Sequence, residues 1–135
     1  VKGLQRYWKR GVVELPEYRL REEPSPAEIQ KALQTEGAAI RERLPRGGAV
    51  VALCIEGKLV SSTQLAQQID AAAVNGESSL AFVIGSSHGL DDSVKQGSKR
   101  ISMSPMTFPH QLARVMLCEQ LYRAFSINAG TKYHK

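Results

Sequence analysis

The fold is decided by residues 49–57, which read AVVALCIEG. The first seven residues form an unbroken apolar run, and glycine bounds the run on both sides, at Gly48 and Gly57. A short apolar run of this kind is typical of a strand that helices cover on both faces, as in a parallel sheet. We therefore expect this stretch to be a central strand of an α/β domain.

Two further stretches are expected to be strands, residues 79–84 (SLAFVI) and residues 99–104. Ser25 and Glu28 are spaced as a capping box, as are Ser61 and Gln64, so that both serines are expected to begin helices. Strands that alternate with helices indicate a single α/β domain with a mostly parallel sheet flanked by helices. The expected helices cover residues 26–44, 62–74, 91–98 and 109–127, and a short early strand is expected at residues 12–15.

Composition sets broad limits on the class of protein. The chain has 135 residues, enough for one domain with its own core, and no apolar run reaches the ~18–20 residues of a membrane span. No signal peptide is recognised at its start. The net charge of +5 favours an anionic partner, nucleic acid first, although many basic proteins bind none.

Cys54 and Cys118 lie in apolar runs and are expected to be buried, reduced cysteines of a cytosolic protein rather than a disulfide or a catalytic thiol.

Three loops are candidates for a ligand site, because ligands of open parallel sheets bind beyond the carboxyl ends of the strands. They cover residues 56–58, 85–89 and 104–109. The second loop lacks the P-loop ending and the dinucleotide fingerprint, so a tight turn is its favoured interpretation when it is taken alone. The third is stiffened by Pro105 and Pro109. It suits two interpretations equally, a holder for a flat heterocycle such as adenine or a helix entry whose apolar side chains pack inward.

The last predicted helix is apolar almost all round, and such a helix is usually enclosed in a core or at a subunit interface. Its Glu119 and Arg123 are four residues apart in the favoured order for a surface ion pair. The alternative places Arg123 near a phosphate or a base, and the sequence leaves both open. His88, His110 and His134 have no metal-ligand spacing, so no metal site is predicted.

Five segments, taken together in order and spacing, resemble the RlmH family of SPOUT methyltransferases. The similarity extends from about Ser25 to the last residue, and the C-terminal third is its most diagnostic part. The segments are LCIEGK at 53–58, FVIG at 82–85, SMSPMTFPHQ at 102–111, EQLYRA at 119–124 and YHK at 133–135.

This resemblance implies a SPOUT-type α/β fold with a C-terminal trefoil knot, one domain over residues 1–135, and a homodimer. The implied activity is S-adenosylmethionine-dependent methylation of N3 of a pseudouridine in large-subunit ribosomal RNA, on the assembled ribosome, in the cytoplasm and without a metal. Arg123, Tyr133 and His134 are implied for catalysis and RNA contact. The backbone of the stretch from Met103 would hold the adenine and methionine parts of the donor. The implied donor-binding residues are Leu53, Gly85, Met103, Ser104, Pro105, Met106, Thr107 and Phe108.

The chain also departs from the family pattern in two places. Ser86 stands where a second glycine is usual, and the opening strand of the family is not found, so residues are expected to be missing at the start. Two other classes of function compete with the enzyme. One is a non-catalytic module of the same fold that binds RNA or the ribosome but not the methyl donor. The other is a doubly wound domain for a different nucleotide, which the missing fingerprint disfavours. Candidates for gripping RNA phosphates are Lys99, Arg100, Lys132 and Lys135.

Overall fold

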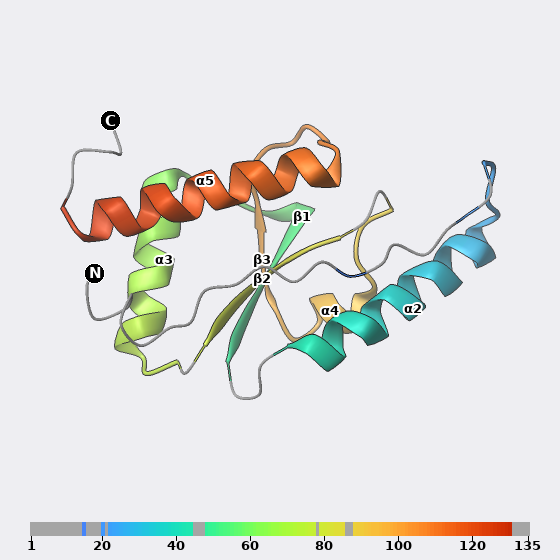
Figure 1. Ribbon diagram of the computed structural model, residues 1–135, viewed down its shortest axis with the longest axis horizontal. Helices are drawn as coiled ribbons and strands as arrows, with labels where there is room; N and C mark the ends of the chain where they lie inside the picture. Colours follow the sequence, from blue (N-terminus) through green and yellow to red (C-terminus); the bar gives the residue numbers. More distant parts are fainter. Residues whose placement is uncertain are drawn as a thin grey trace.

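The computed structural model describes Leu15, Leu20 and residues 22–44, 48–77, 79–85 and 88–130, except for the His110 side chain. Within these residues the predicted alternation of helices and strands is confirmed (Figure 1). The predicted strand at residues 12–15 lies outside them apart from Leu15. The elements are α2 (Pro26–Arg43), β1 (Ala49–Leu59), α3 (Ser62–Val74), β2 (Leu80–Ile84), α4 (Asp92–Lys95), β3 (Lys99–Ser102) and α5 (His110–Asn128).

The three described strands form one parallel sheet in the order β2-β1-β3, which confirms residues 49–55 as the central strand. Val51 and Ala52, adjacent on β1, are both buried and belong to two different core clusters. Val51 packs with Ile69 of α3 and Ala124 of α5, and Ala52 packs with Val94 of α4. Because successive side chains of a strand point to opposite faces, β1 is covered on both sides, as its apolar run predicts.

The helices form the two outer layers of this sandwich (Figure 1). Helices α3 and α5 cover one face of the sheet, and α2 with α4 covers the other. Both predicted capping boxes are present. The Ser25 hydroxyl accepts a hydrogen bond from the Glu28 backbone at 3.2 Å, and the Ser61 hydroxyl accepts one from the Gln64 backbone at 3.1 Å. These caps fix where α2 and α3 begin, because they satisfy backbone N–H groups that no helical carbonyl reaches.

Several predicted boundaries and one burial prediction are wrong. The first strand continues to Leu59 instead of ending at residue 55, and the last strand ends at Ser102 instead of residue 104. The helix expected over residues 91–98 has a single turn, Asp92–Lys95. Cys54 is only half-buried and Cys118 is exposed, because the apolar run around Cys118 is a helix that turns part of its surface outward. No helix among the described residues is long and apolar enough to cross a membrane.

Candidate functional site

The carboxyl edge of the sheet brings together three of the predicted ligand-binding segments. In the strand register Leu53 pairs with Ile84 on one side and with Ile101 on the other. Gly85 directly follows Ile84, and Met103 lies two residues beyond Ile101. Residues that are widely separated in the sequence therefore meet at one edge of three neighbouring strands, where parallel sheets place their ligands.

The first of these segments interrupts the β1–β3 ladder. Leu53 and Lys58 both pair with Ile101, so the residues between them form an irregular excursion of the strand. The prediction that residues 56–58 form a loop after the strand is therefore wrong. These residues lie within β1, where they form an irregularity. A Cβ atom on Gly57 would lie 2.6 Å from the Ile101 carbonyl carbon. Only glycine lets the two backbones approach this closely.

The second segment begins at Gly85, which directly follows β2. A Cβ atom on this residue would lie 2.3 Å from the Gly89 carbonyl oxygen, which is well inside van der Waals contact. The backbone at Gly85 therefore lies close to that of Gly89, whereas the tight-turn interpretation of the whole loop stays a prediction. Ser86 and Ser87 lie outside the described residues, so the departure at Ser86 stays a prediction.

The third segment, residues 103–108, is shaped by two serines. The buried Ser102 hydroxyl donates a hydrogen bond to the Ser104 carbonyl at 2.9 Å, and the Ser104 hydroxyl accepts one from the Met106 backbone at 3.0 Å. The loop therefore has a defined path, although Met106 is 70% exposed. The inward-packed interpretation fails for Met106, whereas Phe108 is half-buried. Pro105 and Thr107 are exposed, and Met103 and Ser104 are half-buried.

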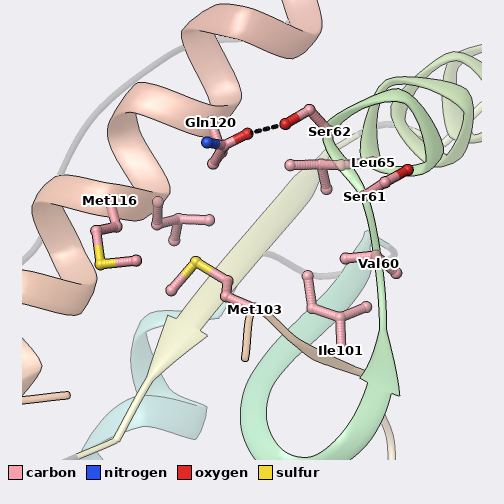
Figure 2. A pocket seen from close by; sticks show the side chains of 9 residues that line it. Val60, Ser61, Ser62, Leu65, Ile101, Met103, Met116 and Gln120 are labelled. Carbon is pink, nitrogen blue, oxygen red and sulfur yellow. Dashed lines mark hydrogen bonds between the residues drawn. The ribbon is translucent and has the colours of Figure 1, made fainter. Parts of the chain in front are cut away.

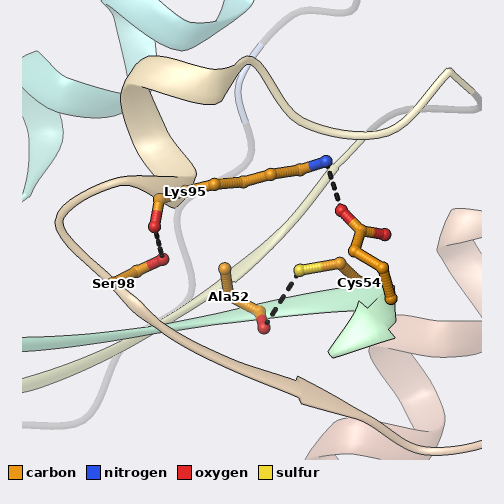
Figure 3. A network of polar contacts seen from close by, with 5 residues as sticks. Ala52, Cys54, Lys95 and Ser98 are labelled. Carbon is orange, nitrogen blue, oxygen red and sulfur yellow. Dashed lines mark hydrogen bonds and ion pairs between the residues drawn. The ribbon is translucent and has the colours of Figure 1, made fainter. Parts of the chain in front are cut away.

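A polar cluster that the sequence did not predict lies beside this edge (Figure 3). Lys95 of α4 donates a hydrogen bond of 2.5 Å to the carboxylate of Glu56 on the β1 excursion. This bond holds the pKa of Glu56 below its ordinary value. Burial raises the pKa of the neighbouring Cys54 thiol, and the Glu56 carboxylate raises it further. A thiol kept protonated in this way is a poor nucleophile, which argues against a catalytic role for Cys54.

Arg123 forms the predicted helix-surface pair with Glu119, at 2.9 Å. The Arg123 side chain retains 25% of its accessible surface, so the pair is partly exposed. Tyr133 and His134 lie outside the described residues, and their expected proximity to Arg123 stays a prediction. In residues 22–44, 48–77, 79–85 and 88–130, no three or more histidine, cysteine, aspartate or glutamate side chains are grouped to hold a metal ion.

A cavity of about 230 Å³ opens next to the third segment (Figure 2). It lies between the start of α3, the end of β3 and the middle of α5. Met103 is the only one of the predicted donor-binding residues that lines it. No sequence pattern predicted this cavity, because its walls come from three elements that meet only in the fold. Its lining residues are Val60, Ser61, Ser62, Leu65, Ile101, Met103, Met116, Leu117 and Gln120.

Comparison with known proteins gives a consistent result. The family described as predicted SPOUT methyltransferase matches residues 1–134. A ribosomal RNA large subunit methyltransferase H of Bacillus cytotoxicus is 46% identical over 136 residues, covering all of this chain and 86% of the relative. Proteins of the same name from Listeria monocytogenes and Oenococcus oeni are 43% and 42% identical, covering all of this chain and 86% and 85% of the relatives.

The resemblance inferred from the five sequence segments is thereby confirmed. The match extends along nearly the whole chain and includes the segments that meet at the carboxyl edge. The chain belongs to the SPOUT methyltransferase family and is an enzyme of that class.

Proposed function

We propose that the chain is a cytoplasmic S-adenosylmethionine-dependent methyltransferase that acts on N3 of a pseudouridine in large-subunit ribosomal RNA, on the assembled ribosome. The observation that carries the proposal is the convergence of Leu53, Gly85 and Met103 at one edge of the sheet. These residues are the ones that the family resemblance implies for the donor. The names of the relatives support the class of RNA substrate.

The residues at this edge are suited to such a donor. The 103–108 loop offers backbone groups along a path that Ser102 and Ser104 define, and Pro105 and Met106 leave it accessible. A cavity lined by apolar side chains together with Ser61, Ser62 and Gln120 adjoins the loop at Met103. Fixed backbone dipoles beside an apolar wall are the usual means by which proteins hold a small heterocyclic ligand.

Catalysis would depend chiefly on positioning. When bound, S-adenosylmethionine supplies a methyl group on a sulfonium, and the protein holds the acceptor nitrogen in line with it. Correct alignment alone can contribute about 7–11 kcal/mol to lowering a barrier. The acceptor nitrogen must also lose its proton, and we propose His134 as the base, with Tyr133 and Arg123 on the RNA side.

RNA would be bound through its phosphates near the same edge of the sheet. Lys99 and Arg100 of β3 are exposed, and the chain carries a net charge of +5. Lys132 and Lys135 are the other candidates. Each phosphate that a cation neutralises releases counterions, so binding should weaken steeply as salt rises. The target base must be reachable, which favours a loop nucleotide or one flipped from its stack.

We also propose that the active form is a homodimer with a C-terminal trefoil knot. Helix α5 supports the dimer, because Leu112, Val115 and Tyr122 are 47%, 64% and 57% exposed at spacings that lie on one side of the helix. Large apolar side chains exposed on one side of a helix are typical of an interaction surface.

The proposed function is tested by titrating S-adenosylmethionine into the parent protein and a Gly85→Trp variant, using calorimetry. The parent should bind saturably and the variant should not, because any side chain at Gly85 collides with Gly89. Gly97→Trp is the matched control, since a Cβ atom added there meets nothing within 4 Å.

Methyl transfer to ribosomes from a strain that lacks the modification would then test the substrate. Activity on assembled ribosomes, lost when the target uridine is left unisomerised, would support the proposed acceptor. Absence of donor binding by the folded parent would instead favour the non-catalytic RNA-binding module. For the base, His134→Ala should lower turnover more than donor affinity, and an equal loss of both would contradict that role.

A further inference from the structure

The excursion of β1 that follows Leu53 is held on two sides. On the β3 side the backbone of Gly57 lies so close that a Cβ atom there would be 2.6 Å from the Ile101 carbonyl carbon. On the α4 side the Glu56 carboxylate accepts a hydrogen bond of 2.5 Å from the Lys95 ammonium group. The excursion therefore makes a close backbone contact with β3 and an ion pair with α4.

The lysine of this pair is much less exposed than its partner. The Lys95 side chain retains 18% of its accessible surface, whereas the Glu56 side chain retains 51%. The Lys95 backbone is also fixed, because its carbonyl accepts a hydrogen bond from the Ser98 hydroxyl at 2.9 Å (Figure 3). A side chain that is largely covered has fewer conformations to lose than one in solvent, so this pair costs less entropy than one between two exposed partners. Lys95 is therefore suited to hold Glu56 in one position.

Helix α4, which carries Lys95, is itself packed against the segment that begins at Gly85. Leu90 and Val94 are 5% and 3% exposed, and both belong to the core cluster around Ala52 of β1. A Cβ atom on Gly85 would lie 2.9 Å from the Leu90 Cγ atom. The ion pair thus links two of the segments proposed for the donor, the one on β1 and the one at Gly85.

The ladder of the sheet leaves this part of β1 to other contacts. Leu53 pairs with Ile101, and the pairing with β3 is interrupted from there to Lys58. A bulged segment re-aims the residues of its strand, and its conformation depends on the contacts that replace the ladder. If a ligand binds only molecules in which the segment has the right conformation, its apparent affinity falls with the fraction of such molecules.

We propose that Glu56 and Lys95 are positioning residues of the donor site, whose ion pair fixes the β1 excursion against α4 and so keeps Leu53 correctly placed relative to the segment at Gly85. The inference rests on the proposed function and deepens it. Neither side chain needs to touch the donor. The affinity lost without the pair is limited by the strength of the pair, which for a partly exposed ion pair corresponds to about 1.4- to 5-fold.

The test is a double-mutant cycle on donor binding, measured by calorimetry with S-adenosylmethionine and S-adenosylhomocysteine. Lys95→Met and Glu56→Gln should each weaken both ligands by the same factor, about 1.4- to 5-fold. The double variant should bind no more weakly than either single variant, because both changes remove the same interaction. Lys31→Met, which removes an exposed cation from α2, is the control and should bind both ligands as the parent does.

A measurement without ligand tests the excursion directly. Amide hydrogen exchange at residues 54–57 should be faster in Lys95→Met than in the parent, while exchange in α3 stays the same. Parent-like exchange and affinity in Lys95→Met would overturn the positioning role. A loss in Glu56→Gln alone would also overturn it, in favour of Arg100, whose charge likewise lowers the Glu56 pKa.

Two further outcomes separate this inference from the proposed function. Losses that add in the double variant, or a selective loss of S-adenosylmethionine, whose sulfonium is charged, would overturn the positioning role and leave the proposed function intact. Failure of the folded parent to bind either ligand would instead overturn the proposed function, and this inference with it.

Discussion

Helices α3 and α5 lie side by side on one face of the sheet, but they use their apolar residues differently. Helix α3 buries Leu65, Ala66 and Ile69 completely, and its one large exposed apolar residue, Val74, is its last. Helix α5 buries Leu117 and Ala124 against the same core and still exposes Leu112, Val115 and Tyr122. The apolar residues of α3 are covered by contacts within the chain, whereas α5 has large apolar residues that the chain does not cover.

The difference shows what apolar patterning can and cannot determine. A one-sided pattern, as in α3, specifies a packing face within the chain. An all-round pattern, as in α5, indicates that more surface must be covered than one sheet can cover, but it does not say by what. The prediction that α5 is enclosed by protein is therefore only half fulfilled in the single chain, and its exposed half is the surface that we propose for the dimer.

The largest expected effect comes from the buried residues of α3. Ile69 is 1% exposed at the centre of the α3 core, and Ile69→Ala should lower the free energy of unfolding by about 2–5 kcal/mol, through lost burial and the cavity left behind. Urea denaturation measures the change. Val74→Ala on the same helix, at a side chain 78% exposed, should stay within about 0.5 kcal/mol of the parent. Equal losses in the two variants would mean that α3 is not packed as described.

The next largest effect comes from the exposed apolar residues of α5. Val115→Asp should weaken association of the proposed dimer by about 1.5–3 kcal/mol, the contribution of burying one aliphatic side chain, because the aspartate stays solvated. Sedimentation equilibrium over a range of protein concentrations gives the change in the dissociation constant. Val74→Asp alters a valine of similar exposure on α3 and should leave association unchanged. A Val115→Asp protein that associates as the parent does would remove α5 from the interface.

A smaller effect would sharpen the comparison at the helix starts. Helix α3 begins with a complete capping box, whereas α5 begins at Pro109 with no side-chain cap. Ser61→Ala should therefore cost about 0.5–2 kcal/mol of folding stability, measured by thermal unfolding without ligand. Thr63→Ala, an exposed change in the same turn, should cost less than about 0.5 kcal/mol. If Ser61→Ala proves as mild as Thr63→Ala, the cap contributes nothing measurable.

The smallest expected effect concerns the ion pair of Glu56 with Lys95 of α4. Helix α4 lies on the face of the sheet opposite α3 and α5. The Glu56 pKa is lowered in the folded protein by Lys95, so the pair contributes stability above the pKa of unfolded Glu56 and loses it as pH falls through the folded pKa. Lys95→Met should cost about 0.2–1 kcal/mol at neutral pH, as expected for a partly exposed pair.

Urea denaturation at a series of pH values tests this expectation. The stability curves of the parent and of Lys95→Met should converge in acid, and the difference should not affect association. Lys99→Met, which removes an exposed cation from β3, is the control and should run parallel to the parent. A difference between parent and Lys95→Met that persists unchanged in acid would show that the pair is not its cause.

Much of the candidate site was predictable because it depends on local chemistry and on one topological rule. The loop at Gly85 was expected to be close-packed, as its approach to Gly89 bears out, and the three strand ends were expected to meet because parallel strands share a carboxyl edge. The residues from Met103 to Phe108 were implied by family resemblance, and the structure adds the two serine hydrogen bonds that shape them. The partnerships of Lys95 with Glu56 and of Ser62 with Gln120 were not predictable, since their members are 39 and 58 residues apart.

The sequence alone therefore determined the features that depend on neighbours along the chain. These are the serine caps at Ser25 and Ser61, the buried central strand at residues 49–55 and the parallel α/β class, because caps and apolar periodicity act over a few residues. Only the tertiary structure decided the excursion of β1 around Gly57, the exposure of Cys118 and the cavity that Met103 shares with Gln120. Each of these arises where separate elements approach within contact distance, and no local pattern specifies how two packed elements divide the space between them.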